Sequence, residues 1–223
     1  MLSFFLPTPP KIQATDASSN TKLEEDTSIY KNTISLKPAL FKYETWVIFA
    51  MFACAGMAGH MMTSQMTNIA SVQIPGWGGA YILVMALAGS SGAGRLIIST
   101  LSDKLGVFNT WKLIFATQIV NMMFFRNYTS PNSIIWGTIV MGLFYGASIP
   151  LCWASVAAVY GKKYLGSIYG IVTNGFAVAA LVGPLLAARI VDTTNSYNGT
   201  FIAIAGFGIL GMILAFTIKE NKK

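Results

Sequence analysis

The pattern of apolar and polar positions divides the chain into a polar stretch followed by six long apolar segments. Residues 11–43 are rich in Ser, Thr, Asn and Lys and show no hydrophobic period, which predicts a mobile, solvated tail. Each apolar segment is close to or above the ~20 residues with which a helix crosses the hydrocarbon of a bilayer. The segments cover residues 44–71, 78–101, 108–125, 133–159, 166–191 and 199–218.

These segments predict helices, because they are continuous apolar runs without the strict alternation of membrane β-strands. The connections between them are short, so neighbouring helices are expected to be antiparallel. We therefore expect an all-α, multi-pass membrane protein. Its six-helix transmembrane domain would span residues 44–218, between a polar N-terminal tail at 1–43 and a short C-terminal tail at 219–223.

Composition agrees with a lipid-embedded protein. Of the 223 residues, 54% are hydrophobic and only 10% are charged, whereas a soluble domain carries about 25% charged residues. Cys54 and Cys152 lie inside apolar runs and are interpreted as small core residues, so neither a disulfide framework nor a metal site is expected. No cofactor is expected either.

The net charge of +7 marks membrane orientation rather than nucleic-acid binding. Residues 1–44 hold five lysines and five acidic residues, so the positive excess lies in the hydrophobic part. Arg126 and Arg189 fall on one side of the predicted membrane. The opposite side holds the N-terminal tail together with Lys104, Lys112, Lys162, Lys163, Lys219, Lys222 and Lys223. The positive-inside rule then places both termini in the cytoplasm of a cell-membrane protein.

A short internal repetition suggests how the six helices are related. Gly94 and Asp103 lie nine residues apart at the end of the second segment, as do Gly183 and Asp192 at the end of the fifth. Those two segments run in opposite directions. Two three-helix units related by inversion would produce this pattern, as in many secondary transporters.

Residues 94–106 are the stretch around which the chain is organised. Arg95 lies seven residues before Ser102, about 10 Å into the membrane at helical rise. A charge near the bilayer centre costs about 2.5–3.5 kcal/mol, so Arg95 either snorkels to the interface beside Asp103 or faces a pathway that recognises an anion. A compact turn is expected after it, in which Asp103 bonds backbone amides and Gly106 takes a positive φ.

Other polar residues inside the segments are candidate lining or packing groups. His60 is interpreted as a proton relay, a ligand contact or, preferentially, a residue bonded to a neighbouring helix, and Gln65 lies close to it in sequence. Gln118, Asn121, Thr173 and Asn174 either line a cavity or bond across helices. Clustered glycines predict close helix packing. No nucleophile–base pair or paired carboxylates occur, so an enzyme is not expected.

The residues resemble the C-terminal half of a major facilitator superfamily transporter. Gly94-Arg95, followed by Ser102-Asp103-Lys104-Leu105-Gly106, resembles the superfamily's turn between its eighth and ninth helices. The segments 160–166 and 183–187 resemble the link into the eleventh helix and that helix itself. The overall pattern is most similar to the oxalate/formate antiporter branch, whose members exchange small carboxylates.

The resemblance implies a substrate site, and the chain also departs from the family's pattern in two ways. Arg95 matches an arginine that faces the substrate, and Tyr145 matches an aromatic residue that lines the site. Phe176 stands where the oxalate transporters have a lysine, so a monocarboxylate or a less charged metabolite fits better than oxalate. A complete transporter has twelve helices, and this chain corresponds to six of them.

The leading hypothesis is a secondary transporter, or half-transporter, of small organic anions that works by alternating access. Arg95 would bind the carboxylate. Gly94, Asp103, Lys104 and Gly106 would form a turn that stabilises one conformation. Further substrate-binding candidates are His60, Gln65, Tyr145, Asn174 and Phe176. The alternative is a non-transporting membrane subunit that needs a separate N-terminal half, or a second copy of itself, as partner.

Overall fold

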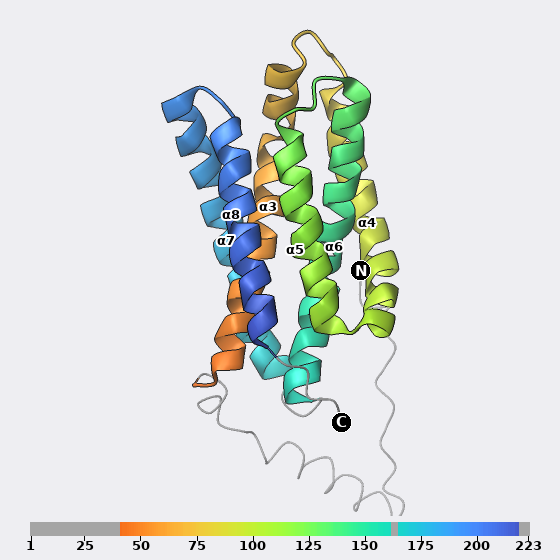
Figure 1. Ribbon diagram of the computed structural model, residues 1–223, viewed down its shortest axis with the longest axis vertical. Coiled ribbons are helices and arrows are strands. Elements are labelled where there is room, and N and C mark those ends of the chain that lie inside the picture. The colour runs from red at the N-terminus through yellow and green to blue at the C-terminus, as the bar shows by residue number, and fades with distance from the viewer. Residues whose placement is uncertain (1–40, 162–164, 219–223) are drawn as a thin grey trace, which may run out of the picture. The chain divides into compact units, whose positions relative to one another are not determined.

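The six predicted helices are present in the computed structural model (Figure 1), which describes residues 41–161 and 165–218. The polar tail predicted at 1–43 lies almost wholly outside the described residues, as does the C-terminal tail at 219–223. The helices are α3 (Tyr43–Gln73), α4 (Ala80–Leu105), α5 (Val107–Phe125), α6 (Pro131–Tyr160), α7 (Leu165–Thr194) and α8 (Asn198–Thr217).

The end of α4 corrects one expectation from the sequence. Asp103 and Lys104 belong to the last turn of this helix and not to a separate turn. The chain reverses at Gly106 alone, whose φ of 85° is the left-handed conformation expected for it. The helix continues this far because the Gly106 N–H still donates to the Ser102 carbonyl oxygen, and no residue before Gly106 favours a break.

Five of the six helices are long and apolar enough to cross a membrane by length and composition, the exception being α5. That helix contains 19 residues and carries several polar side chains among its apolar ones. Two of them bond to other helices. Gln118 Nε2 donates to the Ala55 carbonyl oxygen at 3.2 Å, and Asn121 Nδ2 donates to the Gly137 carbonyl oxygen at 2.9 Å. The lower hydropathy of α5 therefore reflects polar groups that join it to α3 and α6.

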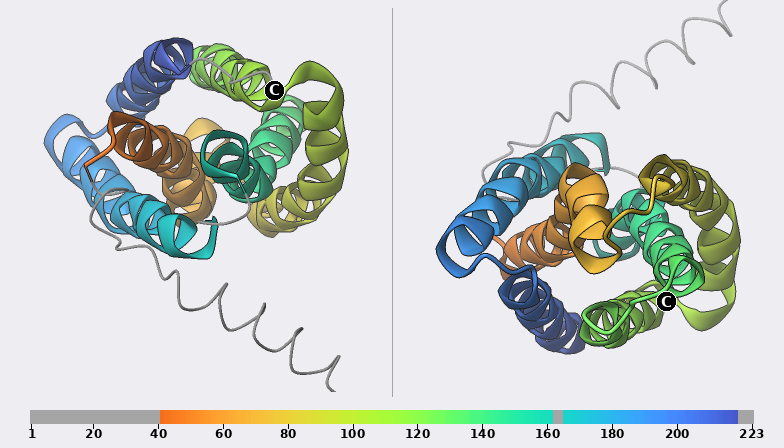
Figure 2. Two further views of the ribbon diagram at one scale, coloured as in Figure 1. Left: turned by 90° about the horizontal axis from the view of Figure 1, so that it is seen from below. Right: turned by 90° about the horizontal axis from the view of Figure 1, so that it is seen from above.

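The packing of the helices has the inverted 3+3 arrangement suggested by the sequence. In an inverted repeat, α3, α4 and α5 correspond to α6, α7 and α8 in that order. The two most extensive helix contacts are α4 with α6 and α3 with α7, and this correspondence converts one into the other. The same correspondence leaves the α5–α8 pair unchanged. Views along the helices show α3 and α6 in the interior, with the other four around them (Figure 2).

The glycines of the repeated sequence pattern make equivalent contacts in the two halves of the repeat. A Cβ atom on Gly94 of α4 would overlap the carbonyl oxygen of Leu143 in α6. In α7, a Cβ atom on Gly183 would come within 3.1 Å of the carbonyl oxygen of Met57 in α3. Small residues thus let the backbones approach closely at both major contacts, as expected between helices in lipid.

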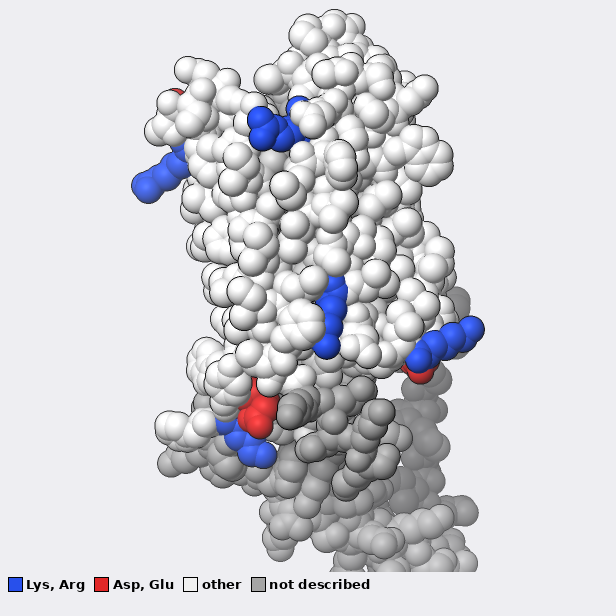
Figure 3. Space-filling view, viewed as in Figure 1, with Lys and Arg blue, Asp and Glu red and all other residues white. Residues whose placement is uncertain are grey.

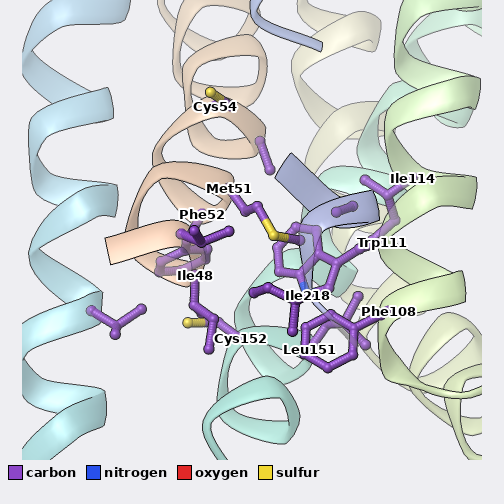
Figure 4. Packing of buried hydrophobic residues seen from close by; sticks show 14 of the residues in the cluster. Ile48, Met51, Phe52, Cys54, Phe108, Trp111, Ile114, Leu151, Cys152 and Ile218 are labelled. Atoms are coloured by element: carbon purple, nitrogen blue, oxygen red, sulfur yellow. The ribbon is translucent and has the colours of Figure 1, made fainter. Parts of the chain in front are cut away.

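Apolar side chains fill the space between the helices in two clusters. One joins the first half of α3 to α5 and α6 and includes Ile48, Phe52, Trp111, Leu151 and Cys152 (Figure 4). The Trp111 indole N–H in this region donates to Ser155 Oγ at 2.7 Å, so its polar atom is satisfied inside the core. The other cluster joins the second half of α3 to α4, α5, α6 and α8.

Basic side chains on the face drawn in Figure 3 gather towards the two ends of the helices and leave a band without charged residues between them. The last turn of α4 carries Lys104 near one end, and α5 ends at Phe125, immediately before Arg126, near the other. The separation of the basic residues to the two ends agrees with the predicted positions of the apolar segments. Which end is cytoplasmic stays a prediction.

Candidate functional site

Four of the residues singled out in the sequence lie at similar depth on four different helices. His60 is on α3, Arg95 on α4, Tyr145 on α6 and Phe176 on α7, and each is within about four residues of the middle of its helix. These helices have 26 to 31 residues, so a helix that crosses the bilayer from end to end would have its middle near the middle of the bilayer. The peripheral pair α5 and α8 contributes none of these residues.

Aromatic rings from three of these helices form one cluster. His60 meets Phe176 edge-on with ring centroids 4.4 Å apart, and meets Tyr145 edge-on at 5.8 Å. Phe176 lies nearly parallel to Tyr145, with centroids 5.9 Å apart, and nearly parallel to Phe52, with centroids 4.9 Å apart. Three near-parallel rings with an imidazole at their edge thus connect α3, α6 and α7.

Arg95 supplies positive charge beside this cluster. Its side chain is exposed, and its guanidinium lies close enough to Tyr145 for the two groups to interact electrostatically. Asp103 is eight residues further along α4, about 12 Å away at helical rise, so it is too distant for a direct ion pair along the helix. Arg95 is exposed, and the planar fork of donors in a guanidinium suits a carboxylate.

His60 differs from the interpretation preferred from the sequence. Its Nε2 atom is buried and has no hydrogen-bond partner among the described residues, so the expected bond to a neighbouring helix is wrong for this atom. The ring is held by Tyr145 and Phe176 instead, through aromatic contacts. A buried polar nitrogen without a partner is costly, which makes it a candidate contact for a bound ligand.

Gln65 and Asn174 do not join the cluster. Gln65 Oε1 accepts from the Tyr197 hydroxyl at 3.2 Å and from Asn68 Nδ2 at 3.1 Å, further along α3. Asn174 is exposed, and its Nδ2 donates to the Gly170 carbonyl oxygen of its own helix at 2.8 Å. Each of these side chains thus has one polar atom bonded within the protein.

The residues expected at the conformational turn are separated in space along α4. Asp103 and Lys104 are exposed in its last turn, and Gly106 connects α4 to α5. Gly94 lies in the middle of the helix, where it packs against α6. Only Asp103, Lys104 and Gly106 are therefore grouped near the chain reversal, which Gly106 alone forms.

Two functional candidates were missed in the sequence. Phe52 stacks on Phe176, and Gly59 lies directly under the ring of Tyr145. A signal was present, because Phe52, Gly56 and His60 recur at intervals of four residues and therefore share one face of α3. Within the described residues, no group of three His, Cys, Asp or Glu side chains is placed to hold a metal ion.

Comparison with known families gives one match. Residues 114–223 match the family described as Major Facilitator Superfamily. The match includes Tyr145 and Phe176 and begins after His60 and Arg95. It agrees with the six-helix half of a major facilitator fold, but it does not separate the oxalate/formate antiporter branch from others.

Curated relatives are transporters of several kinds. The chain is 26% identical to the aspyridones efflux protein apdF of Emericella nidulans over 63% of its length, which is 29% of that protein. It is 34% identical to monocarboxylate transporter 12-B of Danio rerio over 36% of its length and 17% of the relative's. It is 25% identical to apicoplast pyruvate carrier 1 of Toxoplasma gondii over 74% of its length, or 31% of that carrier. The chain thus matches less than a third of each of these relatives.

Proposed function

We propose that this chain is the C-terminal six-helix half of a major facilitator secondary transporter, and that it carries a small monocarboxylate by alternating access. The observation that carries the proposal is the convergence of one arginine and an aromatic cluster from four helices at mid-membrane depth. Transporters of this architecture bind substrate near the bilayer midplane, between repeats. The monocarboxylate and pyruvate carriers among the relatives support the same class of substrate.

Charge favours a monoanion over a dianion. Arg95 is the only Lys or Arg in the middle of a described helix; the others in the described residues lie towards helix ends. Phe176 stands where the resemblance to the oxalate transporters would place a second cation, a lysine. A single guanidinium balances a single carboxylate, while the rings of Tyr145 and Phe176 offer apolar surface to the rest of the molecule.

The cytoplasmic turn would act on conformation and not on substrate. Asp103 and Lys104 are exposed beside the Gly106 reversal, where each can pair with a partner in one conformation and lose it in the other. We propose this role for the three residues at the turn, and a packing role for Gly94.

Uptake of radiolabelled pyruvate, lactate, formate and oxalate into proteoliposomes tests the proposal. We expect saturable uptake of the three monocarboxylates in preference to oxalate. Arg95→Gln should lose at least 90% of this uptake, because a tenfold loss is on the order of the free-energy cost of removing a charge-assisted hydrogen bond. Arg189→Gln, at the end of α7, is the matched control and should leave uptake unchanged. Normal uptake by folded Arg95→Gln would rule out the role of this residue.

Absence of uptake by the wild-type chain distinguishes the half-transporter from a self-sufficient one. In that case the same assay is repeated with the first six helices of a related carrier co-expressed as a separate chain. Restored uptake that still requires Arg95 assigns the chain to a half that works only with a partner. Failure of both arms would leave the second hypothesis, a membrane subunit without transport.

A further inference from the structure

The Tyr145 ring occupies a notch in the surface of α3 that exists only because residue 59 is glycine. A Cβ atom on Gly59 would overlap Cδ2 and Cε2 of the Tyr145 ring and would come within 2.5 Å of its Cγ. Carbon atoms in ordinary contact are about 3.5–4.0 Å apart, so the ring would have to move by about 1 Å or more. Among the described glycines of α3, Gly59 has the shortest distances from its Cβ position to a neighbouring side chain, and all three nearest atoms belong to the Tyr145 ring.

A second ring sits on the neighbouring turn of the same helix in a looser seat. A Cβ atom on Gly56 would lie 3.0 Å from Cδ2 of Phe176 and 3.0 Å from Cβ of Ala179. Phe176 comes from α7 and Tyr145 from α6, so the same face of α3 receives one ring from each neighbouring helix. The two notches therefore fix the relative positions of the rings that make up the cluster.

Movement of Tyr145 would disturb every other member of the site. This ring stacks on Phe176, meets the edge of His60 and lies within electrostatic reach of Arg95. Gly59 itself has no side chain with which to touch a substrate. Its effect on the site is exerted through Tyr145.

We propose that Gly59 is a positioning residue of the carboxylate site, which sets the location of the Tyr145 phenol beside Arg95 and thereby the space left for the substituent of the anion. This inference rests on the proposed function, because it assigns Gly59 to the same site. It adds that the site is selective for size, and that the residue which determines this lies on α3 rather than among the groups that contact the substrate.

A graded series of glycine substitutions tests the proposal on the purified full chain, with radiolabelled pyruvate and lactate as probes. Gly59→Ala is expected to raise the apparent Kd for both by about tenfold or more and to change their ratio, as displacement of a contact to a charged group would do. Gly56→Ala should have a smaller effect, because its neighbours need to move only by a few tenths of an ångström. Gly206→Ala, on α8 with no atom within 4 Å of its Cβ position, is the matched control and should bind like the wild type.

A double-mutant cycle separates positioning from general packing. In the Tyr145→Ala background, adding Gly59→Ala should cost no further affinity, because the ring that the methyl group displaces is gone. If Gly59→Ala weakens binding equally in both backgrounds, the residue acts through packing of α3 alone and the proposal is wrong. Affinity is measured on the monodisperse fraction, so a change in the yield of folded protein does not enter the result.

A readout without ligand keeps this proposal separate from the proposed function. The chain is labelled with 3-fluorotyrosine, and the resonance of Tyr145 is assigned by its loss in Tyr145→Phe. Gly59→Ala should shift this resonance and Gly206→Ala should not. An unchanged resonance would overturn the seating of Tyr145 by Gly59. If the shift occurs but the wild-type chain binds no carboxylate, the proposed function fails while the positioning of Tyr145 stands.

Discussion

Polar side chains have two different uses inside this bundle, and the choice depends on what lies opposite each residue. Gln118 and Asn121 donate to backbone carbonyl oxygens of other helices, and the Trp111 indole reaches a serine hydroxyl. Thr173 and Asn174 instead donate to carbonyl oxygens of their own helix, and these bonds do not connect it to another helix. The sequence had left open whether Gln118, Asn121, Thr173 and Asn174 line a cavity or bond across helices, because an isolated polar residue in an apolar run carries no information about its partner.

Replacement of Asn121 by alanine should destabilise the bundle modestly. The change removes the bond to the Gly137 carbonyl oxygen and the 3.4 Å contact with the Tyr128 hydroxyl. Interhelical bonds of this kind are worth about 0.6 kcal/mol on average, so a fall of a few degrees in the thermal midpoint in detergent is expected. Asn109→Ala, on the same helix, should leave the midpoint nearly unchanged, because Asn109 is exposed and its bonds to the Leu105 carbonyl oxygen and to Lys112 are both exposed to solvent. Equal effects of the two changes would contradict the role of Asn121.

At the scale of the elements, the contact between α4 and α6 depends on mutual close approach of backbone. Cβ atoms on Gly94 and on Gly146 would overlap carbonyl oxygens of Leu143 and Ser91, respectively, and one on Gly142 would come within 2.8 Å of the Leu87 carbonyl oxygen. Backbone atoms of a helix cannot rotate aside as a side chain can. The two helices would have to separate to accept even one methyl group.

Gly94→Ala should therefore be strongly destabilising despite the better helix propensity of alanine. Overpacking costs typically about 1–3 kcal/mol, and rigid backbone neighbours place this site at the upper end of that range. Gly89→Ala on the same helix has no atom within 4 Å of the new methyl group and should be neutral or slightly stabilising. The thermal midpoint of each variant by nanoscale fluorimetry is the measurement. A Gly94→Ala variant as stable as the wild type would show that α4 and α6 can separate freely.

At the scale of the whole molecule, the positions of the basic residues predict an orientation in the membrane, which can be measured directly. Asn109 and Asn127 flank the two ends of α5 and are both exposed, while Cys54 and Cys152 are buried. The chain therefore offers a low background for labelling of introduced cysteines. The positive-inside rule places the Asn109 end in the cytoplasm.

A membrane-impermeant maleimide should label Asn127→Cys in intact cells and Asn109→Cys only after permeabilisation. Both variants are made in a background with Cys54→Ala and Cys152→Ala, and labelling is quantified on the purified protein. The two positions are matched, because they carry the same side chain at opposite ends of one helix. The reverse pattern would invert the predicted topology, and labelling of both in intact cells would mean that α5 does not span the membrane.

The sequence alone determined the number of helices, their approximate bounds and their alternating direction. Apolar length and the position of charges are local properties of each segment, and they determine whether and in which direction that segment crosses the bilayer. The inverted repeat was also present, in the matching positions of Gly94 and Gly183. Only the tertiary structure decided that α4 packs on α6 and α3 on α7, that Tyr145 rests on Gly59, and that Gln65 and Asn174 lie away from the aromatic cluster. These features depend on which small residue faces which ring or backbone, and an apolar pattern that suits lipid on every side of a helix does not specify its neighbours.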